Sequence, residues 1–312
     1  MRAALVVGIG NYSSAPLRGP VHDANAIAKA LETHSNGDPN FSVELLTTPR
    51  PVTKPILWAE IDKLFAADCD VCLFYFSGHG VITSTGGYIV IPDGKSDVGV
   101  SMDEILILAN QSRAKDRVIL LDCCHAGAAG VPALTGNMTL LREGLSILTA
   151  CRGSESALEV DGESVFTSLI VAALQGGAAD LRGYVTAGSI YAYVDQALGP
   201  WDQRPIFRTN VTRFTSLRSV APPVPLETLR KICSYFSDPQ DKYPLDPSYE
   251  FTDSRAKSAN VVIMKDLQKY ASVGLVVPVG EDYMYFAAIN SKSCRLTALG
   301  HQYWRLVKAK MI

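Results

Sequence analysis

The chain has 312 residues, of which 47% are hydrophobic and 19% are charged, and its formal net charge at pH 7 is -2. This length suffices for one sizeable α/β domain and a smaller second one, and the composition excludes a largely disordered protein. The small net charge provides no general attraction to nucleic acid or to an anionic membrane surface.

The sequence contains no segment that we expect to enter or cross a membrane. The apolar run over residues 3–9 is too short for a signal peptide with its cleavage site, and no stretch approaches the ~18 apolar residues that span a bilayer. The seven cysteines are odd in number, unlike those of a secreted disulfide framework. We therefore expect thiols at Cys69 and Cys72 and a cytoplasmic location.

Strand-like and helix-like segments alternate over the first two-thirds of the chain. The strand-like segments are short apolar runs at residues 2–8, 42–47, 70–77, 117–122, 145–150 and 205–208. The helix-like segments either begin at a capping residue or carry apolar residues at helical spacing. They are residues 23–34, the segment after Thr53, residues 105–110 after the capping box of Ser101 and Glu104, and residues 166–175 and 187–198. Strands separated by helices predict an α/β/α sandwich with a mostly parallel sheet.

The pattern changes at the proline-rich segment 218–225, which is typical of a stiff linker. We therefore divide the chain into a domain at 1–217, this linker, and a second domain at 226–312. In the second domain, helices are predicted at 226–237 and 261–271, and residues 296–300 lead into a further helix through Leu306. Paired strands are predicted at 274–279 and 282–289. Helices followed by a β-hairpin resemble a winged helix, a small α+β fold.

Two reactive side chains follow strands of the predicted sheet. His79 comes directly after the third strand and Cys124 directly after the fourth. In an open parallel sheet, functional groups gather at the carboxyl ends of the strands. If these two strands are neighbours, both side chains face one crevice.

The segments that contain these residues resemble known motifs. Tyr75-Phe76-Ser77-Gly78-His79-Gly80 and Asp122-Cys123-Cys124-His125-Ala126-Gly127 resemble the histidine and cysteine motifs of the caspase and metacaspase clan. The 45 residues from His79 to Cys124 are close to the interval found in caspases. The resemblance covers roughly residues 2–210, including Arg18 to Ala24, Leu148 to Cys151 and Val165 to Thr167. It implies the caspase-type fold and peptide-bond hydrolysis, and it is nearest to the metacaspase and orthocaspase type from prokaryotes.

The resemblance also implies roles for the two reactive residues. The Cys124 thiolate attacks the scissile carbonyl to form a thioester, and His79 transfers the protons. The backbone N–H groups of Gly80 and Cys124 form the oxyanion hole. Alternation along the strand points Cys123 to the opposite side, toward the core. We find no third residue to orient the histidine, so we expect a dyad, and we expect Gly78 and Gly80 to let the backbone approach the substrate.

Two acidic residues match positions that line the S1 pocket of metacaspases, which receives the residue before the scissile bond. Asp23 and Asp122 would there favour Arg or Lys. The alternative interpretation of each residue is structural: Asp23 is a carboxylate at a helix start, and Asp122 ends a strand. A caspase proper, which cleaves after aspartate, needs a cationic pocket, and only Arg18 is near that position. Arg142 is the candidate for self-cleavage, because it is the only basic residue between Cys124 and Arg152 apart from His125.

We expect neither a metal nor another cofactor. Some metacaspases bind calcium through acidic clusters, and Asp93, Asp97 and Asp103 are nearby candidates. However, residues 126–139, which follow the predicted nucleophile, contain no acidic residue. Cys69 and Cys72 have a C-x₂-C spacing, but a zinc site usually needs four ligands and no second such pair exists.

The expected partners are a protein or peptide substrate and a protein activator that docks on the second domain. With 12 basic and 9 acidic residues, a net charge of +3, that domain is weakly suited to nucleic acid. By family resemblance, such fusions act in bacterial defence or signalling. The rival hypothesis is a catalytically silent scaffold or a winged-helix DNA-binding regulator, against which the intact His79 and Cys124 argue.

Overall fold

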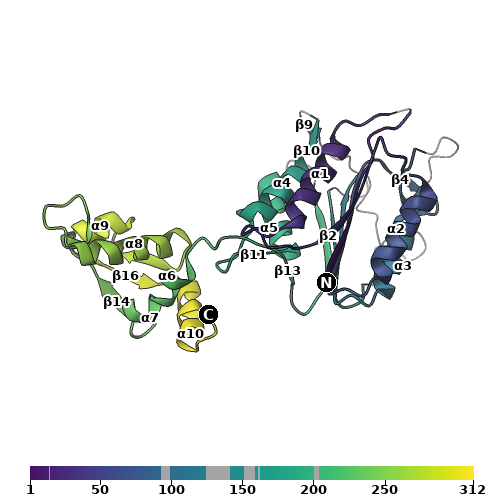
Figure 1. Ribbon diagram of the computed structural model, residues 1–312. Coiled ribbons are helices and arrows are strands. Elements are labelled where there is room, and N and C mark those ends of the chain that lie inside the picture. The colour runs from purple at the N-terminus through teal and green to yellow at the C-terminus, as the bar shows by residue number, and fades with distance from the viewer. Residues whose placement is uncertain (14, 93–98, 124–140, 151–158, 161, 200–203) are drawn as a thin grey trace. The chain divides into compact units, whose positions relative to one another are not determined.

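The computed structural model describes residues 1–312 except 14, 93–98, 124–140, 151–158, 161 and 200–203 (Figure 1). The chain forms two compact units. Unit 1 comprises residues 1–180 and 184–220, and unit 2 comprises residues 181–183 and 221–312. Each unit has its own hydrophobic core, so each is described by itself.

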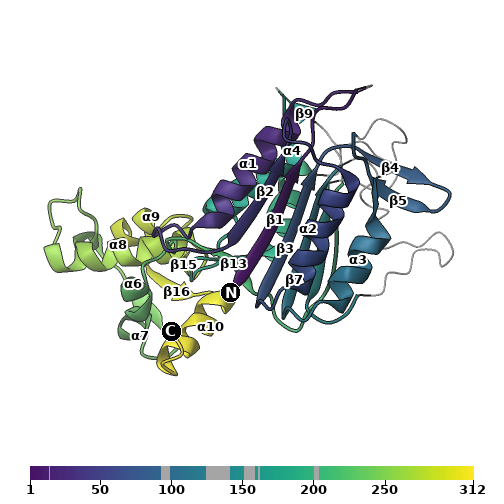
Figure 2. The same cartoon turned by 45° about the vertical axis from the view of Figure 1, so that its right-hand side comes forward.

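Unit 1 is built on a six-stranded sheet with the order β12-β8-β7-β3-β1-β2. Its strands are β1 (Arg2–Gly8), β2 (Ser42–Thr47), β3 (Val71–Ser77), β7 (Asp116–Asp122), β8 (Leu145–Thr149) and β12 (Ile206–Asn210). All neighbours are parallel except β12, which runs antiparallel to β8. The prediction of a mostly parallel sheet is therefore confirmed, and β3 lies between β1 and β7 (Figure 2).

Helices cover both faces of this sheet (Figure 1). One face packs against α2 (Lys54–Ala66) and α3 (Met102–Gln111). The other face packs against α1 (Gly19–Glu32), α4 (Val165–Ala172) with the π-helical turn Ala173–Gly177, and α5 (Ala187–Leu198). This arrangement is the predicted α/β/α sandwich.

Side chains of the central strands alternate between the two faces. On β3, Tyr75 joins the core beneath α1, α4 and α5, whereas Phe74 and Phe76 join the core beneath α2 and α3. On β7, Leu120 faces the first of these cores and Leu121 the second. Alternation of period two therefore determines which core each polar residue at the strand ends adjoins.

The helix starts follow capping chemistry in most places. The Thr53 hydroxyl accepts from the Ile56 N–H, and Ser101 and Glu104 form the predicted capping box. The predicted start of the first helix is wrong: α1 begins at Gly19, because Pro20 suits the first turn of a helix. Asp23 therefore lies beyond the first turn, and the helix dipole does not explain it.

Smaller sheets complete unit 1. β4 (Gly80–Thr83), β5 (Gly86–Ile89) and β6 (Val100–Ser101) form an antiparallel arm that begins directly after His79. Two further pairs are β9 (Glu159–Val160) with β10 (Glu163–Ser164), and β11 (Tyr184–Thr186) with β13 (Ser216–Ser219).

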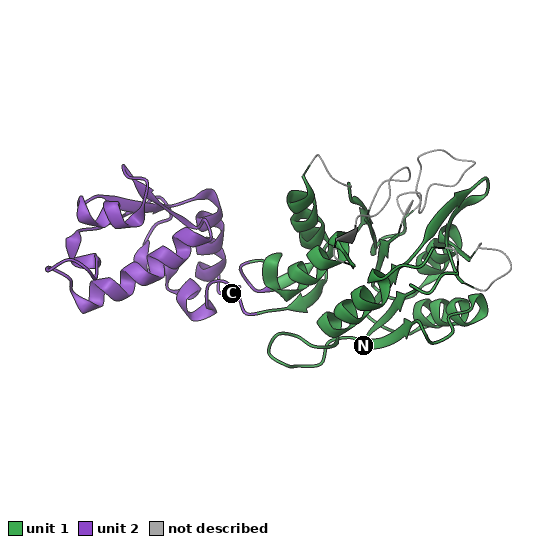
Figure 3. Cartoon of the chain, turned by 90° about the horizontal axis from the view of Figure 1, so that it is seen from above, with its two compact units in different colours: residues 1–180, 184–220 green, residues 181–183, 221–312 purple. Residues whose placement is uncertain are grey.

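Unit 2, purple in Figure 3, combines helices with a three-stranded antiparallel sheet. The strand order of this sheet is β14-β16-β15. Its elements are α6 (Leu226–Arg230), α7 (Ile232–Tyr235), β14 (Lys242–Pro244), the 3₁₀ turn Pro247–Tyr249, α8 (Ser258–Ser272), β15 (Val276–Val279), α9 (Met284–Ile289), β16 (Ser293–Leu296) and α10 (Ala298–Lys308). Val224, at the end of the proline-rich segment, is fully buried in this core.

The strand predicted at 282–289 is wrong, because the structure has helix α9 there. Met284, Ala287 and Ala288 are its buried residues, and their spacing is that of one helix face. The strand that pairs with β15 is instead β16, Ser293–Leu296. The connection between the two strands is thus a helix, not a tight turn at Gly280.

The cysteines also differ from expectation. Cys69, just before β3, and Cys72, on β3, form a disulfide instead of two thiols. The short spacing and the turn into the strand bring both sulfur atoms into the same core. Cys123 and Cys294 are buried and not disulfide-bonded. The disulfide gives no support to a reducing compartment, so the cytoplasmic location remains a prediction from the sequence.

Among the helices within the described residues, none is both long and apolar enough to cross a lipid bilayer.

Candidate active site

The carboxyl ends of β3 and β7 lie side by side. Ser77, the last residue of β3, is paired in register with Asp122, the last residue of β7. One residue further, the Gly78 N–H donates to the Asp122 carbonyl at 3.3 Å. His79 therefore leaves the sheet beside the point where β7 runs into the cysteine motif. Cys124, the predicted nucleophile, lies outside the described residues.

The first segment of the chain holds His79 in place. The His79 backbone N–H donates to the Tyr12 hydroxyl at 2.9 Å, and the two rings lie 4.4 Å apart between centroids. The Tyr12 hydroxyl in turn donates to the Val90 carbonyl at 3.2 Å. Burial raises the pKa of Tyr12, which keeps this hydroxyl protonated and able to donate. These contacts constrain both the backbone and one face of the histidine.

The imidazole itself is oriented by a main-chain group. Its Nε2 lies 2.7 Å from the Ala15 carbonyl oxygen. Because a carbonyl oxygen only accepts, Nε2 carries the hydrogen, and in the neutral ring Nδ1 is the basic nitrogen. The dyad of side chains, His79 and Cys124, stays a prediction, and the structure adds a main-chain carbonyl that orients the histidine. A carbonyl has no side-chain identity, so no residue type at position 15 could have predicted it.

Gly78 lies where a side chain would not fit. A Cβ at this position would lie 2.5 Å from the Tyr12 hydroxyl and 2.9 Å from the Phe76 ring, and the backbone φ is +157°. A glycine is needed at position 78 because Tyr12 and Phe76 occupy the space that a Cβ would take. Gly80, the predicted oxyanion-hole residue, is the first residue of β4 and is paired with Ile89.

The adjacent cysteine behaves as the strand alternation predicted. Cys123 is only 1% exposed and packs in the core beneath α2 and α3, together with Leu121. Asp122, between them in sequence, adjoins the opposite core. The burial of Cys123 agrees with its expected place in the core, and the reactive role of Cys124 stays a prediction.

The two predicted S1 residues lie in one buried polar cluster. Asp23 on α1 is 2% exposed and Asp122 is 3% exposed. The Ser77 hydroxyl donates to Asp23 at 3.4 Å, and the Ser164 N–H donates to the other oxygen at 3.4 Å. The Thr167 hydroxyl donates to Asp122 at 2.5 Å. Sequence reasoning did not identify Ser164 or Thr167, although both belong to α4 or its cap.

An exposed histidine lies beside this cluster. The His22 ring is 4.0 Å from one Asp23 oxygen and 3.6 Å from the Glu163 carboxylate. No role was predicted for His22 from the sequence.

Arg142 is not brought to this site. Its backbone N–H donates to the Asn110 side chain at 2.9 Å, close to the amino end of β8. Because β7 and β8 are parallel, that end of β8 lies at the edge of the sheet opposite to His79.

Metal ligands do not gather in the described part of the chain. Within it, no group of three or more His, Cys, Asp or Glu side chains has an arrangement that could hold a metal ion. Asp103 lies in the first turn of α3, whereas Asp93 and Asp97 lie outside the described residues. The absence of a cofactor remains a prediction.

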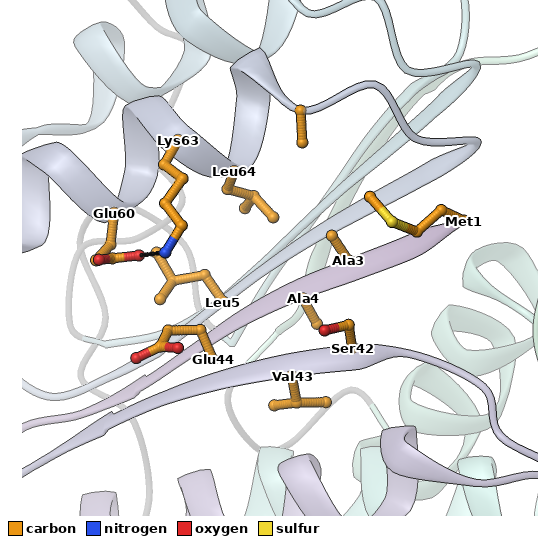
Figure 4. A pocket seen from close by; sticks show the side chains of 11 residues that line it. Met1, Ala3, Ala4, Leu5, Ser42, Val43, Glu44, Glu60, Lys63 and Leu64 are labelled. Carbon is orange, nitrogen blue, oxygen red and sulfur yellow. Dashed lines mark hydrogen bonds and ion pairs between the residues drawn. The ribbon is translucent and has the colours of Figure 1, made fainter.

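A cavity of about 220 Å³ lies elsewhere on unit 1 (Figure 4). It is lined by the first residues of β1 and β2 and by the second half of α2, where Glu60 and Lys63 form an ion pair of 2.9 Å. It contains none of the candidate catalytic residues and lies by the amino end of β1. It is therefore not the candidate active site.

Comparison with known proteins gives the fold and the family. The family described as the Caspase domain matches residues 1–215. A crystal structure of protein GSU0716 from Geobacter sulfurreducens is similar, with a TM-score of 0.54, 16% identity, and 70% of this chain and 100% of that chain covered. Caspase-1 from Spodoptera frugiperda is similar, with a TM-score of 0.52, 14% identity, and 70% and 90% covered. No curated protein sequence matches.

A mostly parallel sheet between two helical layers, with an oriented histidine at its carboxyl edge, defines unit 1 as a caspase-type α/β domain. The chain belongs to the Caspase domain family. This is a family of cysteine peptidases, so its substrates are proteins or peptides.

Proposed function

We propose that this chain is a cysteine endopeptidase of the metacaspase type that cleaves after Arg or Lys. The observation that carries the proposal is the oriented imidazole. The Ala15 carbonyl fixes Nε2 of His79, so Nδ1 is the nitrogen that exchanges protons at the edge where the cysteine motif begins.

In the proposed reaction, the sulfur of Cys124 forms a bond to the scissile carbonyl carbon. The C–N bond then breaks, and the amine leaves with a proton from His79. Water attacks the thioester, His79 takes up the proton of that water, and the C–S bond breaks to release the acid and the thiolate. The N–H groups of Gly80 and Cys124 stabilise the oxyanion, and losing one such donor typically costs ~10²–10³ in rate.

The buried carboxylates of Asp23 and Asp122 support the preference for a basic P1 residue. Two carboxylates in a narrow pocket match the forked donors of a guanidinium, and an aspartate at P1 would meet repulsion. Selective recognition of such a polar group can reach ~10⁴-fold over an analogue that lacks it. The preference for Arg or Lys over neutral residues should therefore be strong.

Unit 2 is proposed as a regulatory docking domain with a winged-helix-like arrangement of helices and antiparallel strands. Its small positive charge favours a protein activator over DNA. Regulation through such a domain fits a bacterial signalling or defence pathway, as the family resemblance implies.

The test is a set of fluorogenic peptides that differ only at P1, with Arg, Lys, citrulline or Asp. We expect turnover of the Arg and Lys peptides only, and loss of the preference in Asp23→Asn and Asp122→Asn. Faster cleavage after Asp would contradict the proposed specificity. Failure of the wild-type chain to turn over any peptide, or to react with a thiol-directed peptide ketone, would favour the silent scaffold.

A further inference from the structure

A tyrosine hydroxyl lies at the centre of the buried polar cluster. Tyr75 is on β3, has no exposed surface, and shares its face of the strand with Ser77, two residues further on. Its hydroxyl lies 2.6 Å from the Thr167 hydroxyl. The same Thr167 hydroxyl lies 2.5 Å from an oxygen of Asp122.

The chemistry fixes the direction of these hydrogen bonds. A carboxylate only accepts, so the single hydrogen of the Thr167 hydroxyl is donated to Asp122. The Thr167 oxygen then accepts, and the donor must be the Tyr75 hydroxyl. The result is a chain of two donations, from Tyr75 to Thr167 and from Thr167 to Asp122.

The charge of the second carboxylate, Asp23, also acts on Tyr75. Burial raises the pKa of Tyr75 well above its ordinary value, and the charges of Asp122 and Asp23 raise it further. The hydroxyls of Thr167 and Ser77 act in the opposite direction. Ser77 is the residue that donates to Asp23. Tyr75 therefore remains protonated, and able to donate, at any pH at which a peptidase is assayed.

We infer that Tyr75 and Thr167 are positioning residues of the S1 pocket, which hold Asp122 in its anionic form and in the orientation that selects a basic P1 side chain. This inference rests on the proposed function. Hydrogen bonds to a carboxylate favour its charged form, and hydroxyl donors do so without cancelling that charge. The charge of Asp122 is thus kept for the substrate.

The experiment compares two substrates that differ in charge but not in shape. Citrulline at P1 replaces the guanidinium with a neutral urea, so the ratio of kcat/KM for the Arg peptide to that for the citrulline peptide reports the pocket's preference for charge. In Tyr75→Phe, we expect this ratio to fall about tenfold, because the hydrogen bond from Tyr75 to Thr167 is lost. In Thr167→Val, we expect a fall of about 10², because the hydrogen bond to the Asp122 carboxylate itself is lost. Thr167→Ser keeps the hydroxyl and should retain the wild-type ratio.

The control is Ser146→Ala. Ser146 on β8 is 3% exposed and its hydroxyl lies 2.7 Å from that of Thr209, near the opposite edge of the same sheet. This variant loses a buried, hydrogen-bonded serine hydroxyl, but it should leave the Arg-to-citrulline ratio unchanged.

The outcomes separate the inference from the function on which it rests. A wild-type preference for Arg that falls in Tyr75→Phe and Thr167→Val, and is kept in Thr167→Ser, supports the inference. If both peptides lose turnover equally, or if the ratio stays at its wild-type value in both variants, the positioning role is overturned while the basic specificity stands. If the wild-type chain does not prefer Arg over citrulline, both the inference and the proposed specificity are wrong.

Discussion

The Tyr12 hydroxyl accepts a hydrogen bond from the His79 backbone N–H at 2.9 Å while its ring packs against the imidazole at 4.4 Å. Tyr12, in the first connecting loop, thus contacts both the backbone and the ring of the candidate catalytic histidine. The same hydroxyl donates to the carbonyl of Val90, which directly follows β5. Tyr12 therefore joins His79 to the end of the β4–β5 hairpin.

Tyr12→Phe should lower kcat about tenfold with little change in KM, because the His79 N–H loses its acceptor while the ring remains in place. Steady-state kinetics with an Arg peptide would measure this. The control is Tyr88→Phe, which removes a hydroxyl bonded to Thr85 on the exposed hairpin arm. Equal rates for Tyr12→Phe and the wild-type chain would contradict a supporting role for this hydroxyl.

Gly78→Ala should reduce kcat by about 10², because a displacement of the reacting groups of about 1 Å can cost that much. The new methyl group would lie 2.5 Å from the Tyr12 hydroxyl. The double variant Gly78→Ala/Tyr12→Phe removes that clash and should be more active than Gly78→Ala alone. Strict additivity of the two effects would show that the methyl group acts elsewhere.

Cys124→Ala should abolish peptidase activity and leave the thermal unfolding temperature unchanged, because only the thiolate route is available. Cys123→Ala should do the reverse. It should retain turnover and lose about 1 kcal/mol of unfolding free energy, since a buried sulfur is removed from the core. An inactive Cys123→Ala with an active Cys124→Ala would reverse our assignment of the nucleophile.

Self-cleavage after Arg142 should require a second molecule, because Arg142 lies at the edge of the sheet opposite to His79. We expect active enzyme to cut the inactive Cys124→Ala chain between Arg142 and Glu143. The fraction cut per unit time should rise with enzyme concentration, as intact-mass spectrometry would measure. A rate of self-cleavage that does not change on dilution would indicate cleavage within one molecule.

Activity should not require calcium, since residues 126–139 contain no acidic residue. Turnover of an Arg peptide should be the same with excess chelator and with added calcium. Asp103→Asn is a suitable control variant, because this carboxylate is the candidate calcium ligand within the described residues. A loss of turnover in chelator that calcium alone restores would overturn the prediction.

Most of the sheet could be predicted because its central strands carry runs of buried apolar residues. The run at residues 2–8 is a strand with the predicted bounds, since a parallel strand buried on both faces has no competing helical pattern. The strand prediction at 282–289 was wrong because the apolar pattern there is ambiguous. Its alternating aromatic residues, Tyr283 and Tyr285, imitate a strand, whereas its core contacts follow the helical spacing of Met284 and Ala287.

The site was predictable only where it is made of side chains. His79 and the buried pair Asp23 and Asp122 belong to motifs that can be read along the chain. Thr167 contributes through its hydrogen bond to Asp122, which lies 45 positions earlier in the chain, and no local sequence pattern predicts this contact. In the sequence, Tyr75 is one of several aromatic residues of a buried strand. A role for its hydroxyl can be inferred only from the contact with Thr167 that the fold creates.

The carbonyl that orients the imidazole has a consequence for mutational scanning. A side-chain substitution at Ala15 leaves the backbone oxygen in place. A library that replaces every residue in turn should therefore record position 15 as tolerant, although its carbonyl contacts the candidate catalytic histidine. The contact becomes visible only to changes of the main chain itself. Replacing the Ala15–Pro16 linkage by an isostere without the carbonyl, through chemical ligation, would expose a functional group that amino-acid replacement cannot delete.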